Sequence, residues 1–177
     1  MKILKTITLV TTLLIGAVTF AQNEKDKKII EDANKAKQTL LEKDAGLENF
    51  FDTSAGYVIF PNVGKGGFIV GGASGNGAVY EDGKVIGMAD LKKLNIGLQA
   101  GGQAIIEVIF FETEKDLKAF KESNFQFGAE ASAVAVKSGI AFNAKYKDGV
   151  AVFAMPKAGL MADASVGGQK FKYSPIK

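Results

Sequence analysis

The sequence predicts an α+β fold. A strongly coiled antiparallel β-sheet, or a small barrel, follows an amphipathic helix and is joined by one further helix. Three observations predict this: helical spacing near the N-terminus, Asp-Gly pairs between apolar runs, and 21 glycines that fall mostly in or beside strand-like segments. Glycine inside a strand marks a bulge or a bend, and repeated bends favour a sheet that coils.

The first helix is expected over residues 24–45, where apolar residues recur at helical spacing: Ile29, Ala33, Ala36 and Leu40. Gly46 predicts its end, and a second short helix is expected over residues 47–53. Two interpretations of the apolar stripe remain open. It either docks on the rest of the domain or lies on a membrane surface.

Two Asp-Gly pairs predict hairpins. Asp82-Gly83 separates two apolar runs, and Asp148-Gly149 separates residues 142–146 from residues 150–153. A type I′ turn needs positive φ at both central residues, which Asp and Gly tolerate. The pairs therefore favour an antiparallel sheet.

The run 104–111 is the most hydrophobic segment of the expected sheet and predicts a strand covered on both faces. Thr113 follows as a helix cap, and Glu114 and Asp116 suit the positive end of the helix dipole. Glu107 interrupts the run. Because an unpaired buried charge is costly, Glu107 is expected to be paired, protonated or in contact with a polar ligand.

The N-terminus predicts export. Lys2 and Lys5 precede an apolar stretch, and small residues at positions 19 and 21 predict cleavage after Ala21. A membrane anchor is the alternative, although about 15 apolar residues are short for a bilayer. The expected organisation is a signal peptide (1–21), a helical segment (22–52) and a Gly-rich β core (53–177), with a periplasmic location.

Composition argues against an enzyme. The chain has no His and no Cys, so the Ser-His-Asp and Cys-His arrangements and the His- and Cys-based metal sites are absent. Gly64-Lys65-Gly66 lacks two of the four fixed positions of a phosphate-binding loop. We therefore predict no catalytic residues, no metal and no cofactor.

Charge placement indicates where an anionic surface could bind. All cationic residues are Lys, and the mature chain is nearly neutral, which argues against a nucleic-acid partner. Residues 134–177 carry seven Lys and two acids, whereas residues 22–45 carry six of each. The candidate lipid-binding residues are therefore the C-terminal lysines and the helix stripe: Lys137, Lys145, Lys147, Lys157, Lys170, Lys172, Ile29, Ala33 and Leu40.

Several motifs in order resemble the SYLF domain. They are Gly56–Pro61 with the glycines that follow it, Ile96–Gln103, Phe127–Glu130 and Lys157–Ser165. The resemblance covers about residues 30–173 and implies a lipid-binding module. Yeast-type members bind actin, which an exported chain is not expected to meet. The phosphoinositide binding of eukaryotic members is attributed to a basic N-terminal helix, from which this charge-balanced helix departs.

The leading hypothesis is thus a non-catalytic protein of the bacterial envelope that binds an anionic lipid or membrane surface. The alternative is a structural protein that contacts other envelope proteins or forms homo-oligomers, because exposed sheet edges favour self-association.

Overall fold

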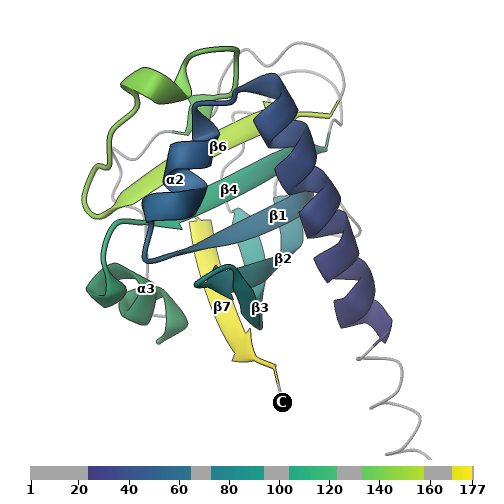
Figure 1. Cartoon of the computed structure of the whole chain (residues 1–177). Coiled ribbons are helices and arrows are strands. Elements are labelled where there is room, and N and C mark those ends of the chain that lie inside the picture. Colours follow the sequence, from purple (N-terminus) through teal and green to yellow (C-terminus); the bar gives the residue numbers. More distant parts are fainter. Residues whose placement is uncertain (1–23, 65–72, 94–103, 123–132, 158–168, 177) are drawn as a thin grey trace, which may run out of the picture.

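A computed structural model describes residues 24–64, 73–93, 104–122, 133–157 and 169–176 (Figure 1). The expected signal peptide and the motif residues at 66–72, 96–103, 127–130 and 158–165 lie outside these ranges. An N-terminal helix spans residues 24–43. The remaining elements are α2 (Leu47–Thr53), β1 (Gly56–Gly64), β2 (Ala73–Glu81), β3 (Lys84–Lys93), β4 (Ile105–Phe111), α3 (Glu114–Lys121), β5 (Val134–Ala135), a 3-10 turn η1 (Ala141–Asn143), β6 (Val150–Pro156) and β7 (Gln169–Pro175).

The strands form one sheet in the order β5-β6-β4-β1-β2-β3-β7. All neighbours are antiparallel except β5 and β6, which are parallel. The α+β class is therefore confirmed, but two details of the expectation are corrected. The sheet is mixed, and within the described residues it is open, because β5 and β7 are not paired and no barrel closes.

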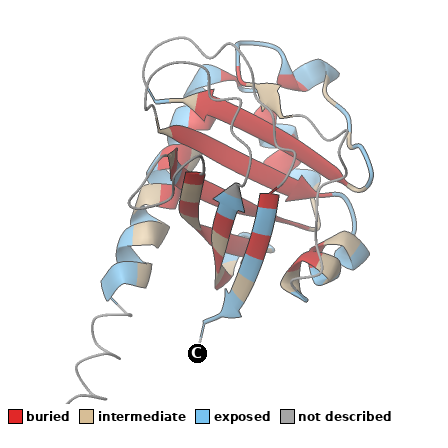
Figure 2. Ribbon diagram, turned by 180° about the vertical axis from the view of Figure 1, so that it is seen from behind, coloured by how far each residue is buried: buried red, intermediate tan, exposed pale blue. Residues whose placement is uncertain are grey.

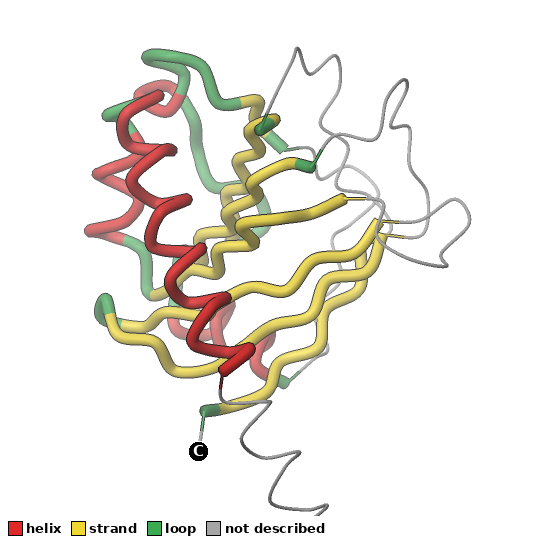
Figure 3. The backbone as a smooth tube through the Cα atoms, turned by 90° about the vertical axis from the view of Figure 1, so that its right-hand side faces the viewer, coloured by secondary structure: helices red, strands yellow, loops and turns green. Residues whose placement is uncertain are grey.

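Aromatic contacts show that the open sheet bends. Phe60 of β1 and Phe171 of β7 have ring centroids 6.0 Å apart. Three strand-to-strand steps separate these strands, or about 14 Å in a flat sheet. Phe120 of α3 lies 5.5 Å from Phe171 and fills the inside of the bend. Figure 3 shows the strands curving in this way.

Helices cover both faces of the sheet. The N-terminal helix and α2 pack on one face with Tyr57, Phe110 and Phe153, and α3 packs on the other. Successive side chains of a strand point to opposite faces of the sheet. All seven residues of β4 are buried, as predicted, so both faces of the sheet are covered there. Seen from behind in Figure 2, by contrast, the strand that ends at the C-terminus, β7, alternates between buried and exposed residues.

Local signals fix several boundaries. Asp82 and Gly83 both have positive φ and join β2 to β3, as predicted. Asp148 and Gly149 also form their turn, but the segment before it is not a strand; a single bridge joins Lys147 to Val150. The predicted cap of α3 is confirmed. The Thr113 hydroxyl accepts a hydrogen bond from the Asp116 backbone N–H, and the Asp116 carboxylate accepts one from Thr113 N–H at 3.1 Å.

Candidate functional site

Two apolar side chains stand out on the loop between β5 and β6. Phe142 is 75% exposed and Ile140 is 40% exposed, and they flank the first residue of the turn η1. In the described ranges, Ile176 near the C-terminus is the one other large hydrophobic residue that is exposed. A single exposed apolar residue is ordinary, whereas two on one short turn form a local apolar surface. We call residues 137–147 the apolar loop.

A buried carboxylate holds the apolar loop in place. Asp44, at the end of the N-terminal helix, is 2% exposed. Its Oδ2 accepts a hydrogen bond from Ala141 N–H at 2.8 Å, and its Oδ1 accepts hydrogen bonds from Gly139 N–H at 3.2 Å and Gly46 N–H at 3.1 Å. Hydrogen bonds to a charged acceptor are strong. Phe142 is therefore displayed by an anchored turn.

Gly46 allows the loop to approach α2. A Cβ atom at this position would lie 3.0 Å from the backbone nitrogen of Phe142 and 3.1 Å from Cβ of Ala141. Most real Cβ contacts are longer than this, so a larger residue would push the loop away. Gly46, which predicts the end of the N-terminal helix, therefore also allows the apolar loop to pack closely.

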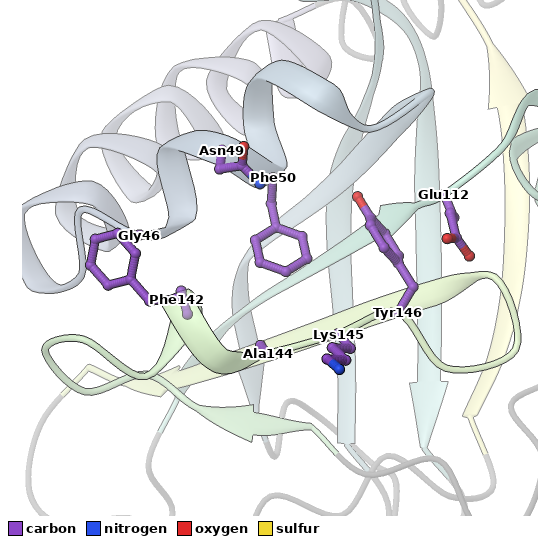
Figure 4. Close-up of a pocket in the computed structure, with 9 residues that line it drawn as sticks. Gly46, Asn49, Phe50, Glu112, Phe142, Ala144, Lys145 and Tyr146 are labelled. Atoms are coloured by element: carbon purple, nitrogen blue, oxygen red, sulfur yellow. The ribbon is translucent and has the colours of Figure 1, made fainter.

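A pocket of about 480 Å³ lies beside Phe142 (Figure 4). Phe50 of α2 and Tyr146 of the apolar loop form part of its wall, with ring centroids 5.3 Å apart. Lys145 and Glu112 add one charge of each sign. Burial, and then the charge of Glu112, raise the pKa of Tyr146 to about 12, so its hydroxyl is neutral at physiological pH.

Three of the predicted lysines lie on the same loop as the exposed apolar residues. Lys137, Lys145 and Lys147 belong to the apolar loop and are exposed. The chain therefore places cationic groups within five residues of Phe142 on either side. Exposed apolar groups with lysines beside them are typical of surfaces that bind the interface of an anionic membrane.

The other predicted lysines lie elsewhere. Lys170 and Lys172 are on β7, the opposite edge of the sheet from β5. Lys157 follows the last residue of β6, whereas the apolar loop precedes the first. The C-terminal charge excess is therefore split between separate regions.

The predicted apolar stripe of the N-terminal helix docks on the sheet, which decides between the two interpretations. Ala33 and Leu40 are fully buried and Ile29 is half-buried, so Ala33 and Leu40 are removed from the candidate lipid contacts. Lys37 reinforces the docking, because its Nζ lies 4.3 Å from the ring centroid of Phe51 and donates to the Tyr57 hydroxyl at 3.3 Å.

Glu107 is fully buried in β4, where the strand register places Phe60 on one side and Ala154 on the other. It belongs to the interior of the domain and not to the surface around Phe142. Across the described ranges, no three acidic side chains come together as a metal site would require.

Sequence reasoning missed Ile140 and Phe142. Phe142 falls in the strand-like segment 142–146 that is expected before Asp148-Gly149, where an aromatic residue is typical of the core, and no prediction covers Ile140. The available signal was Ser138-Gly139, a pair that favours a turn and here has Gly139 at φ +78°.

Comparison with known proteins agrees with the resemblance. The sequence model of the family described as "Ysc84: Las17-binding protein actin regulator" matches residues 92–174, which run from the end of β3 into β7. This part of the chain is similar to the Ysc84, or SYLF, family. The match contains the apolar loop and both β7 lysines.

One relative is "Beta cell expansion factor A" of Aeromonas veronii, which is 32% identical over 83 residues. The aligned stretch is 46% of this chain and 32% of the relative, so the chain spans about a third of that relative's length. SYLF domains are linked to lipid or actin binding.

Proposed function

We propose that this protein is a non-catalytic lipid-binding protein of the bacterial envelope, and that the apolar loop is its membrane contact. The observation that carries the proposal is Phe142, which is 75% exposed on a turn that the Asp44 carboxylate holds. Phe is among the apolar residues that peripheral membrane segments bury at the boundary between headgroups and acyl chains.

Charge supports the same surface. Lys137, Lys145 and Lys147 flank the apolar residues, and each lysine near an anionic leaflet contributes about 1 kcal/mol to binding. Apolar insertion and lysine attraction together give the two weak signals that peripheral attachment needs. Within the described ranges, no helix is both long and apolar enough to span a bilayer.

The predicted signal peptide supports a location in the bacterial envelope. The basic and apolar N-terminal stretch predicts a signal peptide with cleavage after Ala21, which would bring the mature chain to the periplasmic membrane surfaces. Actin is not proposed as a partner in that compartment.

Vesicle co-sedimentation tests the proposal. The mature chain is expected to sediment with phosphatidylglycerol-containing vesicles and weakly with phosphatidylcholine alone. Phe142→Ala should weaken vesicle binding roughly tenfold, because partial burial of a Phe side chain in the membrane contributes about 1.5 kcal/mol to the binding free energy. Ile176→Ala is the matched control, since Ile176 is exposed but lies outside the apolar loop.

A charge series completes the test. Replacing Lys137, Lys145 and Lys147 with Gln should weaken binding on the order of a hundredfold at low salt. The control replaces Lys25, Lys28 and Lys84, which are exposed on other elements. Equal losses in both triple variants, or no binding by the unaltered chain, would remove the proposal. Concentration-dependent self-association without any lipid effect would favour the structural alternative.

A further inference from the structure

A groove of about 480 Å³ lies on strands β2, β3 and β7, the opposite end of the sheet from the apolar loop. The polar side chains that line it come from two adjacent cross-strand rows. Ser74, Lys92 and Lys170 are partners in one row, and Asn76, Asp90 and Lys172 are partners in the next.

The first row contains an unfavourable pair. Lys92 of β3 lies directly opposite Lys170 of β7, and both are exposed. Like charges at directly opposite positions destabilise a sheet. Lys172 follows on the same side of β7, so three ammonium groups border one groove.

The nearby acid does not neutralise the three lysines. The Asn76 side-chain amide donates a hydrogen bond to the Asp90 carboxylate. Asp90 is the one acid among the groove residues, which leaves a net charge of +2 there. Within the described part of the chain, Lys92, Lys170 and Lys172 form no ion pair.

Protection of a sheet edge explains only part of this arrangement. Lysines on an edge strand such as β7 discourage pairing with another chain. Lys92, however, lies on β3, which is flanked by β2 and β7 and is not an edge. A bound anion between the two rows would account for the lysines on both β3 and β7.

We propose that this groove binds a phosphate group, held by Lys92 and Lys170 with Lys172 and the Ser74 hydroxyl at its border. A phosphate offers several strong acceptor oxygens, and ammonium groups bind it by charge-assisted hydrogen bonds. The group could belong to a free phosphate ester or to a lipid headgroup. This site goes beyond the proposed membrane contact and does not use the apolar loop.

The test is an NMR titration of the mature chain with inorganic phosphate and with glycerol phosphate, at constant ionic strength. Saturable shifts are expected for the amides of Ser74, Lys92 and Lys170. The double variant Lys92→Gln/Lys170→Gln should bind about 25-fold more weakly, because each lysine contributes roughly fivefold. Lys25→Gln/Lys28→Gln is the control of equal charge.

A second arm separates the two sources of phosphate. It uses vesicles with and without phosphatidylglycerol and a Phe142→Ala background, in which the apolar loop contact is weakened. The groove is assigned to lipid headgroups if Lys92→Gln/Lys170→Gln abolishes the residual vesicle binding and free phosphate causes no NMR shifts. Saturable shifts alone would assign it to soluble phosphate esters.

The proposal is overturned if Lys92→Gln/Lys170→Gln weakens neither phosphate binding nor vesicle binding more than Lys25→Gln/Lys28→Gln does. Thermal unfolding confirms that the variant is folded. Without phosphate it should be at least as stable as the parent, because the opposed like charges are gone. If Phe142→Ala leaves vesicle binding unchanged while the groove still binds phosphate, only the proposed membrane contact is overturned.

Discussion

The two ends of the bent sheet present lysines in different settings. At the β5–β6 end, Lys137, Lys145 and Lys147 lie on the same loop as two exposed apolar residues, and a buried carboxylate anchors the turn. At the β3–β7 end, Lys92 and its neighbours border a polar groove on regular strands. The lysines therefore stand beside apolar side chains at one end and beside polar side chains at the other, and the two proposed contacts differ in the same way.

The largest expected effect is at Asp44, and it should be confined to one end of the sheet. Asp44→Ala leaves the backbone N–H groups of Gly46, Gly139 and Ala141 without their acceptor. The donors of Gly46 and Ala141 are buried, and each costs about 1 kcal/mol or more when it is left unsatisfied, so the free energy of unfolding should fall by about 2 kcal/mol. Urea unfolding measures this.

Asp52→Ala provides the control for Asp44, because Asp52 is exposed on α2 and its loss should change stability by less than about 0.5 kcal/mol. Vesicle binding should fall with Asp44→Ala, while the phosphate response of the β3–β7 groove should persist. Loss of both responses in a folded protein would show that the two ends are not independent.

A smaller effect is expected at Gly46. Gly46→Ala adds a Cβ atom 3.0 Å from the Phe142 backbone nitrogen, and displacing the loop should cost about 1–2 kcal/mol. Gly64→Ala is the matched control, since its nearest new contact is an ordinary 3.5 Å. Equal losses of stability in the two variants would argue against tight packing between α2 and the apolar loop.

The smallest expected effect is a difference in salt dependence. Added salt screens exposed charges but leaves apolar burial largely intact. Phosphate binding at the groove should therefore weaken steeply with sodium chloride, whereas vesicle binding through Phe142 should retain a residual component. Parallel titrations of both responses would measure this, and identical slopes would contradict the distinction.

Much of the fold was predictable because its signals are local. The Asp82-Gly83 turn, the Thr113 cap and the uninterrupted apolar run of β4 each specify structure through a few neighbouring residues. The sheet order was not predictable. Pairing of β4 with β1 and β6 depends on contacts between distant segments, and the same short strands are compatible with a barrel.

The candidate site was predicted in part for the same reason. The charge count located Lys137, Lys145 and Lys147, but it could not show that Lys170 and Lys172 lie at the other end of the sheet. Periodicity identified the helix stripe without saying what covers it. Phe142 was missed because exposure depends on Asp44, 98 positions earlier in the sequence.

Fluorescence from position 142 tests the central claim most directly. The chain contains no Trp, so Phe142→Trp introduces a single reporter, and Ile176→Trp gives a control reporter outside the apolar loop. Addition of phosphatidylglycerol vesicles should shift the Phe142→Trp emission to shorter wavelength and leave Ile176→Trp unchanged. An unshifted spectrum for Phe142→Trp while the protein co-sediments with those vesicles would contradict membrane contact through the apolar loop.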